Sequence, residues 1–320
     1  MRVLVTGGAG FIGSTLVDRL LAEGHDVDVL DDLSTGTLGN LAEARAERTN
    51  RLRFHQIDVG DGHVADLVAR RGPEVVVHLA GRAGVRRSVT HPVEDATANI
   101  VGMLNLLEGA RRGGARKVVV AASGGTVYGE VRARSLPAKE SQGQVPRSPH
   151  GVATRAVLDY LRLYRQLHDL EYTALALANV YGPRQRPATG GDPSSDGAVI
   201  ATFAARLLAG EPCTVHGDGE QTRDFLYVDD CVDAFVRALD RGDGLVINVG
   251  TGVETSVNDL YRALAAAVGA DAPARSAAAH RGELQRSALD PGRAAIQLGW
   301  QPWTPLDEGL GRVLSAAAGS

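Results

Sequence analysis

The sequence predicts an α/β fold, a doubly wound parallel sheet with a smaller C-terminal α+β portion. Short β-branched runs such as VVVHL and KVVVA alternate with helical patterns through the first half of the chain. Continuous apolar strands of this kind are typical of a parallel sheet covered on both faces. A glycine-rich loop joins the first strand to the first helix, and a Gly/Pro/Ser-rich segment after residue 181 marks a change of organisation.

The elements of the first half follow in order. A strand at 2–6 leads through the glycine loop into a helix that ends near residue 23. Further strands are expected at 26–30, 52–56, 75–79, 117–121 and 172–178, with helices at 64–70, 93–112 and 151–168. The last helix carries one apolar stripe at helical spacing, formed by Val152, Ala156, Tyr160, Leu163, Tyr164 and Leu167.

The second half begins with the segment GPRQRPATGGDPSSDG, which is too polar for a core and is read as a linker or a substrate-facing flap. A helix at 198–209, a strand at 214–216, a helix at 228–240 and a strand at 245–249 follow. Residues from 256 to about 300 are expected to be a small helical portion. We therefore expect one domain at 1–180, to which the chain returns at about 226–250, and a second portion at 181–225 and 251–320.

Composition excludes several classes of protein. The chain has 320 residues, 44% of them hydrophobic, which is enough for a large core. A formal net charge of −4 gives no nucleic-acid-binding footprint. Two cysteines make no disulfide framework, and we see neither a leader peptide nor an apolar run of membrane-spanning length. We expect a cytoplasmic protein without a membrane partner, and no metal site.

The loop VTGGAGFIGS predicts a dinucleotide site. Gly7, Gly10 and Gly13 would let the backbone approach a pyrophosphate, and the following helix would present its N-terminus to the phosphates. Asp31 ends the second strand, where a carboxylate can bind a ribose 2′-hydroxyl and would repel a 2′-phosphate. The sequence therefore predicts a Rossmann domain that binds NAD in preference to NADP.

The spacing Gly-x-x-Gly-x-x-Gly resembles the extended short-chain dehydrogenase/reductase family, in particular its UDP-glucose 4-epimerase branch of nucleotide-sugar enzymes. Further motifs run in the order of that family nearly from end to end: DDLSTG (31–36), HLAG (78–81), NIVGMLN (99–105), SGGTVYG (123–129), NVYGPRQ (179–185), GDGEQTRDFLYVDD (217–230), RGE (281–283) and LGW (298–300). The resemblance implies an NAD-dependent enzyme that oxidises a nucleotide sugar, typically at C4, to a transient ketone.

The resemblance also implies roles for individual residues. Asp58 is expected at the adenine amino group, and Ala80, Gly81 and Asn99 along the phosphates and the nicotinamide ribose. The complete set expected to contact NAD is Gly7, Gly10, Phe11, Ile12, Gly13, Asp31, Asp32, Ser34, Gly36, Asp58, Val59, Leu79, Ala80, Gly81, Asn99 and Thr154. The set expected to contact the substrate, most simply a UDP-sugar, is Arg82, Ser123, Gly124, Asn179, Arg223, Arg281 and Ser287.

Two observations concern the outcome of the reaction. Ser123 is the expected hydroxyl partner of the reacting oxygen, with Thr126 in reserve. Dehydratases and decarboxylases of the family carry an extra carboxylate beside this hydroxyl, because an enolising or eliminating step needs a nearby acid/base. This chain has no acid in Gly124-Gly125-Thr126, which favours epimerisation.

The segment SPHGVATR departs from the family pattern S-P-Y-x-x-x-K. His150 takes the place of the acid/base tyrosine and Thr154 the place of the lysine that tunes it; the chain has only two lysines, Lys117 and Lys139. A histidine titrates near neutrality without help from a lysine, so the two changes are consistent with a retuned pair. A shorter ring could also misplace the proton by on the order of 1–2 Å, which can cost about 10²-fold.

Three interpretations stay open at this point. The chain is an NAD-dependent nucleotide-sugar epimerase with His150 as acid/base, or an NAD-dependent dehydratase or oxidoreductase on an unusual nucleotide sugar or nucleoside, or a catalytically weak protein that binds the same ligands. In the resembled family the helices at 93–112 and 151–168 form a four-helix bundle across a two-fold axis, so a homodimer is expected.

Overall fold

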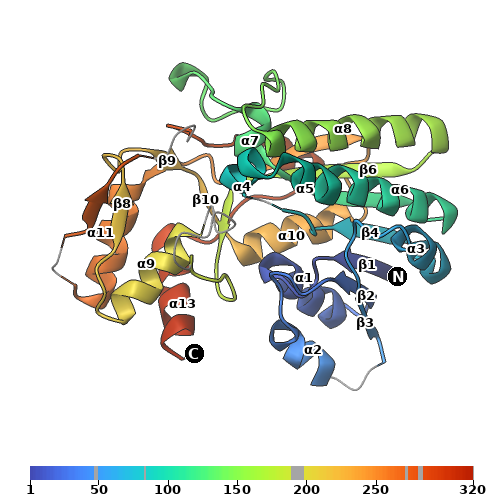
Figure 1. The fold of residues 1–320 in the computed structure, drawn as a ribbon, viewed down its shortest axis with the longest axis horizontal. Coiled ribbons are helices and arrows are strands. Elements are labelled where there is room, and N and C mark those ends of the chain that lie inside the picture. The colour runs from blue at the N-terminus through green and yellow to red at the C-terminus, as the bar shows by residue number, and fades with distance from the viewer. Residues whose placement is uncertain (47–49, 83, 189–197, 271–272, 280–283, 320) are drawn as a thin grey trace.

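The computed structural model describes all residues except 47–49, 83, 189–197, 271–272, 280–283 and 320. Its core is a parallel sheet of seven strands in the order β11-β6-β5-β4-β1-β2-β3 (Figure 1). The strand bounds are β1 Arg2–Thr6, β2 Asp26–Asp31, β3 Leu52–Gln56, β4 Val75–His78, β5 Lys117–Ser123, β6 Glu171–Leu177 and β11 Leu245–Val249. The strand order reverses between β1 and β4, which is where a doubly wound sheet opens a crevice for a ligand. The predicted fold class is confirmed.

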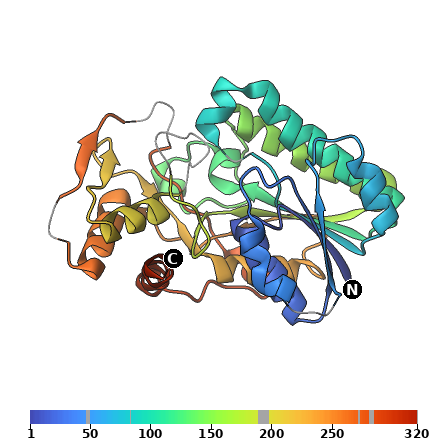
Figure 2. The same ribbon diagram turned by 60° about the horizontal axis from the view of Figure 1, so that its bottom comes forward.

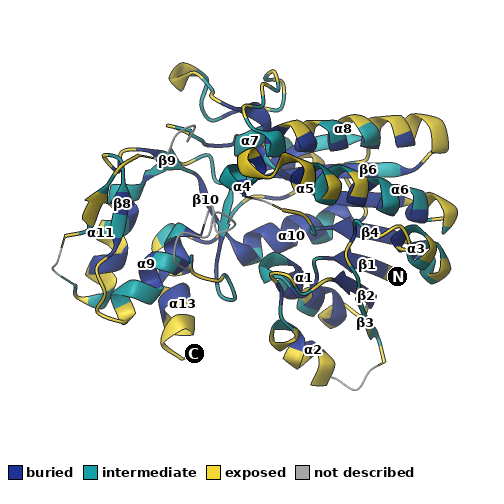
Figure 3. Cartoon of the chain, in the orientation of Figure 1, coloured by how far each residue is buried: buried dark blue, intermediate teal, exposed yellow. Residues whose placement is uncertain are grey.

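Helices cover both faces of this sheet (Figures 1 and 2). Successive side chains of a strand point to opposite faces, so Val3 and Val5 pack in one core cluster and Leu4 in the other. The first cluster includes α1 (Phe11–Ala22) and α10 (Val228–Ala238). The second includes α3 (Val64–Arg71), α6 (Gly102–Arg112) and α8 (Pro149–His168). Figure 3 shows the buried sheet between its half-exposed helices.

The predicted helix at 93–112 is helical but not uniform. It consists of α5 (Pro92–Ala96), a π-helical turn η2 (Thr97–Val101) and α6. Three other short helices occur in the first half of the chain. η1 (Leu38–Leu41) and α2 (Ala42–Ala46) follow β2, and α4 (Val85–Thr90) follows β4. π-turns inside helices are frequent at functional sites, and η2 carries Asn99, which the sequence placed beside the cofactor.

Helix α8 buries a different face from the predicted stripe. Of that stripe only Tyr164 is buried, while Val152, Leu163 and Leu167 are exposed. The buried side chains are instead Ala153, Thr154, Val157, Leu158, Leu161 and Tyr164. The two stripes are neighbours on the helix and both are apolar, so periodicity alone did not identify the one that packs on the sheet.

The C-terminal portion is built around α9 (Val199–Leu208), α11 (Val257–Val268) and α13 (Leu306–Ala318), at the left of Figure 1. It also contains strands, which the sequence did not predict beyond β8 (Thr214–His216). Parallel pairs join β8 to β13 (Arg275–Ala277) and β7 (Asn179–Tyr181) to β10 (Phe225–Tyr227), and β9 (Thr222–Arg223) pairs antiparallel with β12 (Thr255–Ser256). A short helix α12 (Gly292–Gln297) precedes Trp300. Within the described ranges, no helix combines the length and apolarity that crossing a membrane requires.

Candidate active site

The glycine loop between β1 and α1 is closely packed. A Cβ on Gly13 would lie 2.0 Å from the carbonyl oxygen of Gly7, and a Cβ on Gly7 would lie 2.8 Å from the amide nitrogen of Ala80. Gly7 also has a positive φ of 69°, which favours glycine. Helix α1 begins directly after Gly10, which contributes no side-chain cap. The loop therefore presents the uncapped N-terminus of α1 beside the end of β4, an arrangement that fits a dinucleotide pyrophosphate.

The Asp31 carboxylate lies beside the glycine loop. Its Oδ2 accepts a hydrogen bond from the amide of Ala9 at 2.9 Å, and its Oδ1 accepts one from Leu33 at 2.8 Å. The side chain is buried, and each oxygen keeps a lone pair for a ribose hydroxyl. Gly36 lies against Ala9 of the glycine loop, since a Cβ on Gly36 would be 2.7 Å from the carbonyl carbon of Ala9. The structure thus brings the Asp31 carboxylate next to the glycine loop, and we call the two together the cofactor wall.

The other expected cofactor residues are placed around this wall. Phe11 and Ile12 form the first turn of α1, and Leu79, Ala80 and Gly81 follow β4. Asp58 uses Oδ1 to accept a hydrogen bond from Gly60 at 2.8 Å. Asp32 is turned toward Ser34, whose amide and hydroxyl donate to its Oδ1 at 2.9 and 2.6 Å. Val59 is buried and packs against Gly102 at the start of α6.

A buried pair beneath the loop was not found by sequence reasoning. The Thr6 hydroxyl oxygen accepts hydrogen bonds from the amides of Leu79 and Ala80 at 3.3 and 3.2 Å, and lies 2.8 Å from Nδ1 of His78. The single Thr6 hydroxyl proton is therefore available for Nδ1, which must act as an acceptor. Burial lowers the pKa of His78 to about 4, so the ring stays neutral and fixes the end of β4 against β1.

Ser123 and Thr126 lie at the carboxyl end of β5. Ser123 is the last residue of the strand and precedes α7 (Gly124–Tyr128). The Thr126 hydroxyl donates to the carbonyl of Ser123 at 3.2 Å. A Cβ on Gly151 would lie 2.7 Å from the carbonyl oxygen of Thr126, so the start of α8 lies directly against α7.

Tyr128 is the last residue of α7. Its hydroxyl donates to Oδ1 of Asn248 at 2.8 Å inside the core, and burial raises its pKa. It is therefore no substitute for the missing tyrosine. Lys117 is equally remote: its Nζ donates to the carbonyl of Arg241 and to Asp243, at the end of β5 opposite Ser123.

His150 lies in the first turn of α8. The helix begins here because Ser148 accepts a hydrogen bond from the amide of Gly151 at 3.1 Å and Pro149 occupies the first turn. His150 Nδ1 is 3.4 Å from Nδ2 of Asn99 and 3.7 Å from Oδ1 of Asp95. The imidazole thus sits where α8 meets α5 and η2.

Asn99 links His150 to the cofactor wall. Its Oδ1 accepts a hydrogen bond from the amide of Arg82 at 2.9 Å and would lie 2.7 Å from a Cβ on Gly81. Thr154 takes no part in this link, because its hydroxyl donates to the carbonyl of His150 at 2.9 Å. The sequence analysis did not single out Asp95, which lies 3.7 Å from His150; its signal in the sequence was its position one helical turn before Asn99.

The expected substrate residues come from several segments. Gly124 and Gly125 face the C-terminal portion, because Cβ atoms there would lie 2.5 Å from Leu289 Cδ1 and 3.2 Å from Ser287 Oγ. The structure therefore brings Ser287 next to the end of β5. Asn179 and Arg223 begin β7 and end β9, Arg82 follows β4 and is exposed, and Arg281 lies outside the described residues.

Asp224 joins these segments. Its buried carboxylate accepts hydrogen bonds from the amide and hydroxyl of Thr251 and from the amides of Gly252 and Leu289, at 2.6–3.1 Å. Burial raises the pKa of Asp224, and these hydrogen bonds oppose the rise. The residue next to Arg223 is thereby fixed to the segment that carries Ser287.

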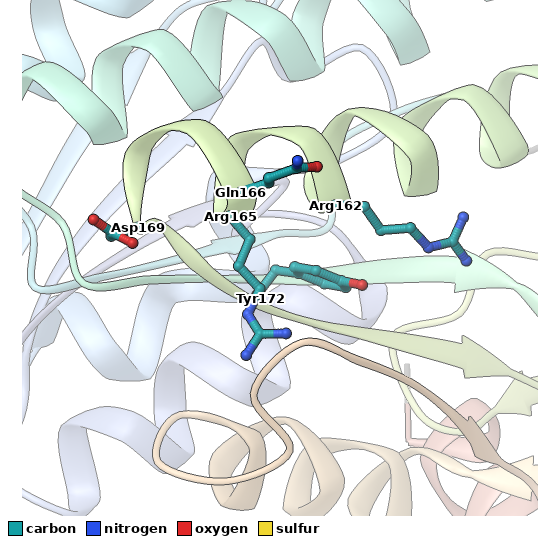
Figure 4. A pocket seen from close by; sticks show the side chains of 5 residues that line it. All are labelled: Arg162, Arg165, Gln166, Asp169 and Tyr172. Carbon is teal, nitrogen blue, oxygen red and sulfur yellow. The ribbon is translucent and has the colours of Figure 1, made fainter.

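A shallow depression of about 340 Å³ lies elsewhere, at the C-terminal end of α8 (Figure 4). Arg162, Arg165, Gln166, Asp169 and Tyr172 line it. Both arginines already have carboxylate partners on the same surface, Asp159 and Glu171. It is at the opposite end of the helix from His150 and has no part in the site.

Comparison with known proteins agrees with this geometry. Residues 3–250 match the NAD dependent epimerase/dehydratase family. A UDP-glucose 4-epimerase of Mycolicibacterium smegmatis is 48% identical over 315 residues, which cover 98% of this chain and 97% of the relative.

Two solved structures share the whole fold. The UDP-glucose 4-epimerase of Thermotoga maritima, solved with UDP-glucose, is 38% identical with a TM-score of 0.92, covering 100% of this chain and 99% of that one. The UDP-glucose 4-epimerase of Thermus thermophilus, solved in complex with NAD, is 37% identical with a TM-score of 0.90 and full coverage of both chains. These matches confirm the resemblance drawn from the motifs and NAD as the cofactor. The chain belongs to the NAD dependent epimerase/dehydratase family.

Proposed function

We propose that this protein is a nucleotide-sugar epimerase that acts on C4 of a UDP-sugar, with His150 as the group that takes and returns the proton. The observation that carries the proposal is the contact chain from the cofactor wall to the imidazole: Gly81 lies against Asn99, and Asn99 lies 3.4 Å from His150. An imidazole, which can accept and donate a proton, therefore lies beside the crevice that fits the dinucleotide. The relatives named above support a UDP-sugar as substrate.

The proposed chemistry is a reversible oxidation. Hydride transfer from and to C4 of the sugar is the chemistry that NAD supplies when bound. His150 takes the proton of the C4 hydroxyl as the hydride leaves, which produces the 4-ketone, and returns the proton after the ketone has turned its other face to the hydride. Ser123, at the end of β5, donates a hydrogen bond to the reacting oxygen and holds it in place.

Epimerisation is favoured over elimination or decarboxylation by the residues of α7. The segment Gly124-Gly125-Thr126 contains no carboxylate, and a step that enolises the ketone needs an acid/base on this side. Product analysis separates the outcomes, because a dehydratase releases a deoxy-keto sugar whereas an epimerase returns a sugar of unchanged mass.

The substrate would lie between the two parts of the chain, with 181–225 and 251–320 as the substrate-binding portion. Asn179, Arg223 and Arg281 are proposed to hold the diphosphate, since guanidinium groups match phosphate oxygens. Ser287 is proposed to border the sugar, because its Oγ lies near Gly125. A side chain this small leaves room for an N-acetyl group, so both UDP-hexoses and UDP-N-acetylhexosamines should bind. If UDP-hexoses bind and UDP-N-acetylhexosamines do not, this prediction is contradicted.

The exposed apolar stripe of α8 supports a homodimer. Leu163 and Leu167 are 43% and 61% exposed, and Val93 at the start of α5 is 77% exposed. Apolar faces on two adjacent helices of one chain can form a four-helix bundle with a second copy. Cys213 and Cys231 are both free thiols, which suits the reducing cytoplasm that we propose as its compartment.

The proposal is tested with His150→Phe, which keeps a planar ring and removes the proton acceptor. We expect UDP-glucose to UDP-galactose conversion, followed by chromatography, to fall by about 10²–10⁴-fold, with NAD binding retained. His168→Phe is the matched control, because this exposed ring lies at the other end of α8 and contacts only Tyr164 among the described aromatic residues. Full turnover in His150→Phe would contradict the proposal.

A double variant tests the exchange of the catalytic pair. His150→Tyr alone should stay poor, because Thr154 carries no charge that could lower the pKa of a phenol. Adding Thr154→Lys should give more activity than either single change, since the two residues act as a unit. Strictly additive effects would show that the two positions do not cooperate.

A further inference from the structure

We infer that Asp95 is a positioning residue for His150: its carboxylate holds the Nδ1 proton of the imidazole, so that Nε2 is left free to take the proton of the sugar hydroxyl. The inference rests on the proposed function for its catalytic consequence. The pairing itself rests only on the geometry of α5, η2 and α8.

The first step is the state of the carboxylate. Asp95 is 3% exposed, and its Oδ2 has no hydrogen-bond partner among the described residues. Its Oδ1 accepts one hydrogen bond from Asn99 and lies 3.7 Å from His150 Nδ1. A buried carboxylate that accepts only this hydrogen bond is costly unless a further donor meets it, and among the described residues His150 Nδ1 is the ionisable nitrogen within 4 Å of Asp95.

The second step is the hydrogen count at Asn99. Its Nδ2 has two hydrogens, and these have nearer acceptors than His150: Asp95 Oδ1 at 3.0 Å and the carbonyl of Arg82 at 3.1 Å. Its Oδ1 is taken by the Arg82 amide. Asn99 therefore has no hydrogen left for His150 Nδ1 at 3.4 Å, and Nδ1 carries a proton of its own that points toward Asp95.

The third step is the consequence for proton transfer. With Nδ1 protonated, the neutral imidazole has its lone pair on Nε2. When the O–H bond of the substrate breaks, the proton forms a bond to Nε2, the C4 hydride leaves with its electron pair to the nicotinamide, and the C=O bond forms. The resulting imidazolium faces an ionised carboxylate, which stabilises its charge without accepting the proton. The 3.7 Å separation has to shorten by less than 1 Å for a hydrogen bond, and such contacts often tighten only with substrate bound.

Other charges near this end of α8 have their own arrangements. Arg87 of α4 binds Glu94 at 2.9 Å, and Arg155 of α8 is exposed and directed to the carbonyl of Gln144. The remaining charged group of α4 is Arg86, and α7 contributes the uncharged Thr126. Asp95 is thus the carboxylate closest to His150 in the described part of the chain.

The test combines NMR with kinetics on the full-length NAD-bound enzyme. ¹⁵N-histidine spectra recorded at alkaline pH, with His150 assigned by comparison with His150→Phe, should show the Nδ1–H tautomer in the wild type. Asp95→Asn should lose that tautomer, because its amide nitrogen can donate to Nδ1, and kcat should fall about 10- to 100-fold while KM for the UDP-sugar stays near that of the wild type. Asp95→Glu, which keeps the carboxylate, should restore part of kcat, and Glu94→Gln is the control for removing a carboxylate from the same helix.

The outcomes are distinct. An Nε2–H tautomer of His150 in the wild type overturns the inference and does not depend on whether an Asp95 variant folds. Unchanged tautomer and kcat in Asp95→Asn also overturn it. If His150→Phe keeps full turnover while Asp95→Asn loses the Nδ1–H tautomer, the proposed acid/base role of His150 fails and the Asp95–His150 pairing is supported.

Discussion

His78 should make folding stability depend on pH in a way that a single substitution removes. Its pKa is lowered by burial from 6.5 to about 4, and Thr6 occupies its Nδ1. Between pH 6.5 and 4 the unfolded chain therefore binds a proton that the folded chain does not, and the free energy of unfolding decreases as the pH falls. Above pH 6.5 the ring is neutral in both states and contributes no pH dependence.

The magnitude follows from the pKa difference at 1.36 kcal/mol per pH unit. The contribution of His78 is a loss of about 2 kcal/mol at pH 5 and about 3 kcal/mol at pH 4. A marginally stable domain has about 5–15 kcal/mol in total, so a loss of this size is measurable. The Thr6 hydroxyl oxygen also accepts hydrogen bonds from the amides of Leu79 and Ala80. Protonation of His78 should therefore loosen the contact between β1 and the end of β4, directly beneath the glycine loop.

The assay is urea unfolding, monitored by circular dichroism, of the wild type and His78→Asn at several pH values from 7 to 4.5. Asparagine can accept the Thr6 hydrogen bond through Oδ1 and does not titrate, so other groups cancel in the difference between the two proteins. The free energy of unfolding of the wild type, relative to that of His78→Asn, should decrease as the pH falls. His63→Asn, at an exposed histidine, should keep the wild-type pH dependence. A difference between wild type and His78→Asn that is constant over this range would refute the reasoning.

Three further predictions concern the cofactor and the assembly. Gly13→Ala should abolish NAD binding by calorimetry, because the new Cβ would meet a carbonyl oxygen at 2.0 Å, whereas Gly62→Ala, with open space around it, should bind NAD normally. Asp31→Ala should lower the affinity for NAD about 10- to 100-fold, since a charged acceptor and its hydrogen bonds are lost. The same change should reduce the ratio of the affinities for NAD and NADP. Equal affinities of the wild type for the two cofactors would contradict this. The double variant Leu163→Glu and Leu167→Glu should be monomeric by light scattering where the wild type is a dimer, and a monomeric wild type at micromolar concentration would end the dimer proposal.

The sequence was sufficient for the sheet and for placing Asp31 beside the glycine loop. Continuous β-branched runs have no other common use than a doubly covered sheet, and the close packing at Gly13 leaves no alternative residue. The face of α8 was not predictable, because Leu158 and Leu161 on one side and Leu163 and Leu167 on the other give two equally apolar stripes. Which stripe meets the sheet depends on the angle at which the helix docks.

Contacts between distant segments were out of reach for a different reason. Asp95 and His150 are 55 residues apart, and they meet only because α5 and α8 pack together at one end. Thr6 and His78 are likewise brought together by the pairing of β1 with β4. Strands of two or three residues, such as β13, are too short to show a period of two. Local pattern carries no information about such pairs.

The position of β11 in the sheet has a consequence for how the protein is made. β11 is an edge strand and covers the open side of β6, yet it lies at residues 245–249, after a long stretch of the C-terminal portion has been inserted. A ribosome-bound chain that has released residues 1–180 therefore exposes the unpaired backbone groups of β6 until translation has advanced about 65 residues further. At about 5–20 residues per second this exposure lasts several seconds. Open strand edges recruit other chains, so truncation at the boundary near residue 181 should yield an aggregating fragment.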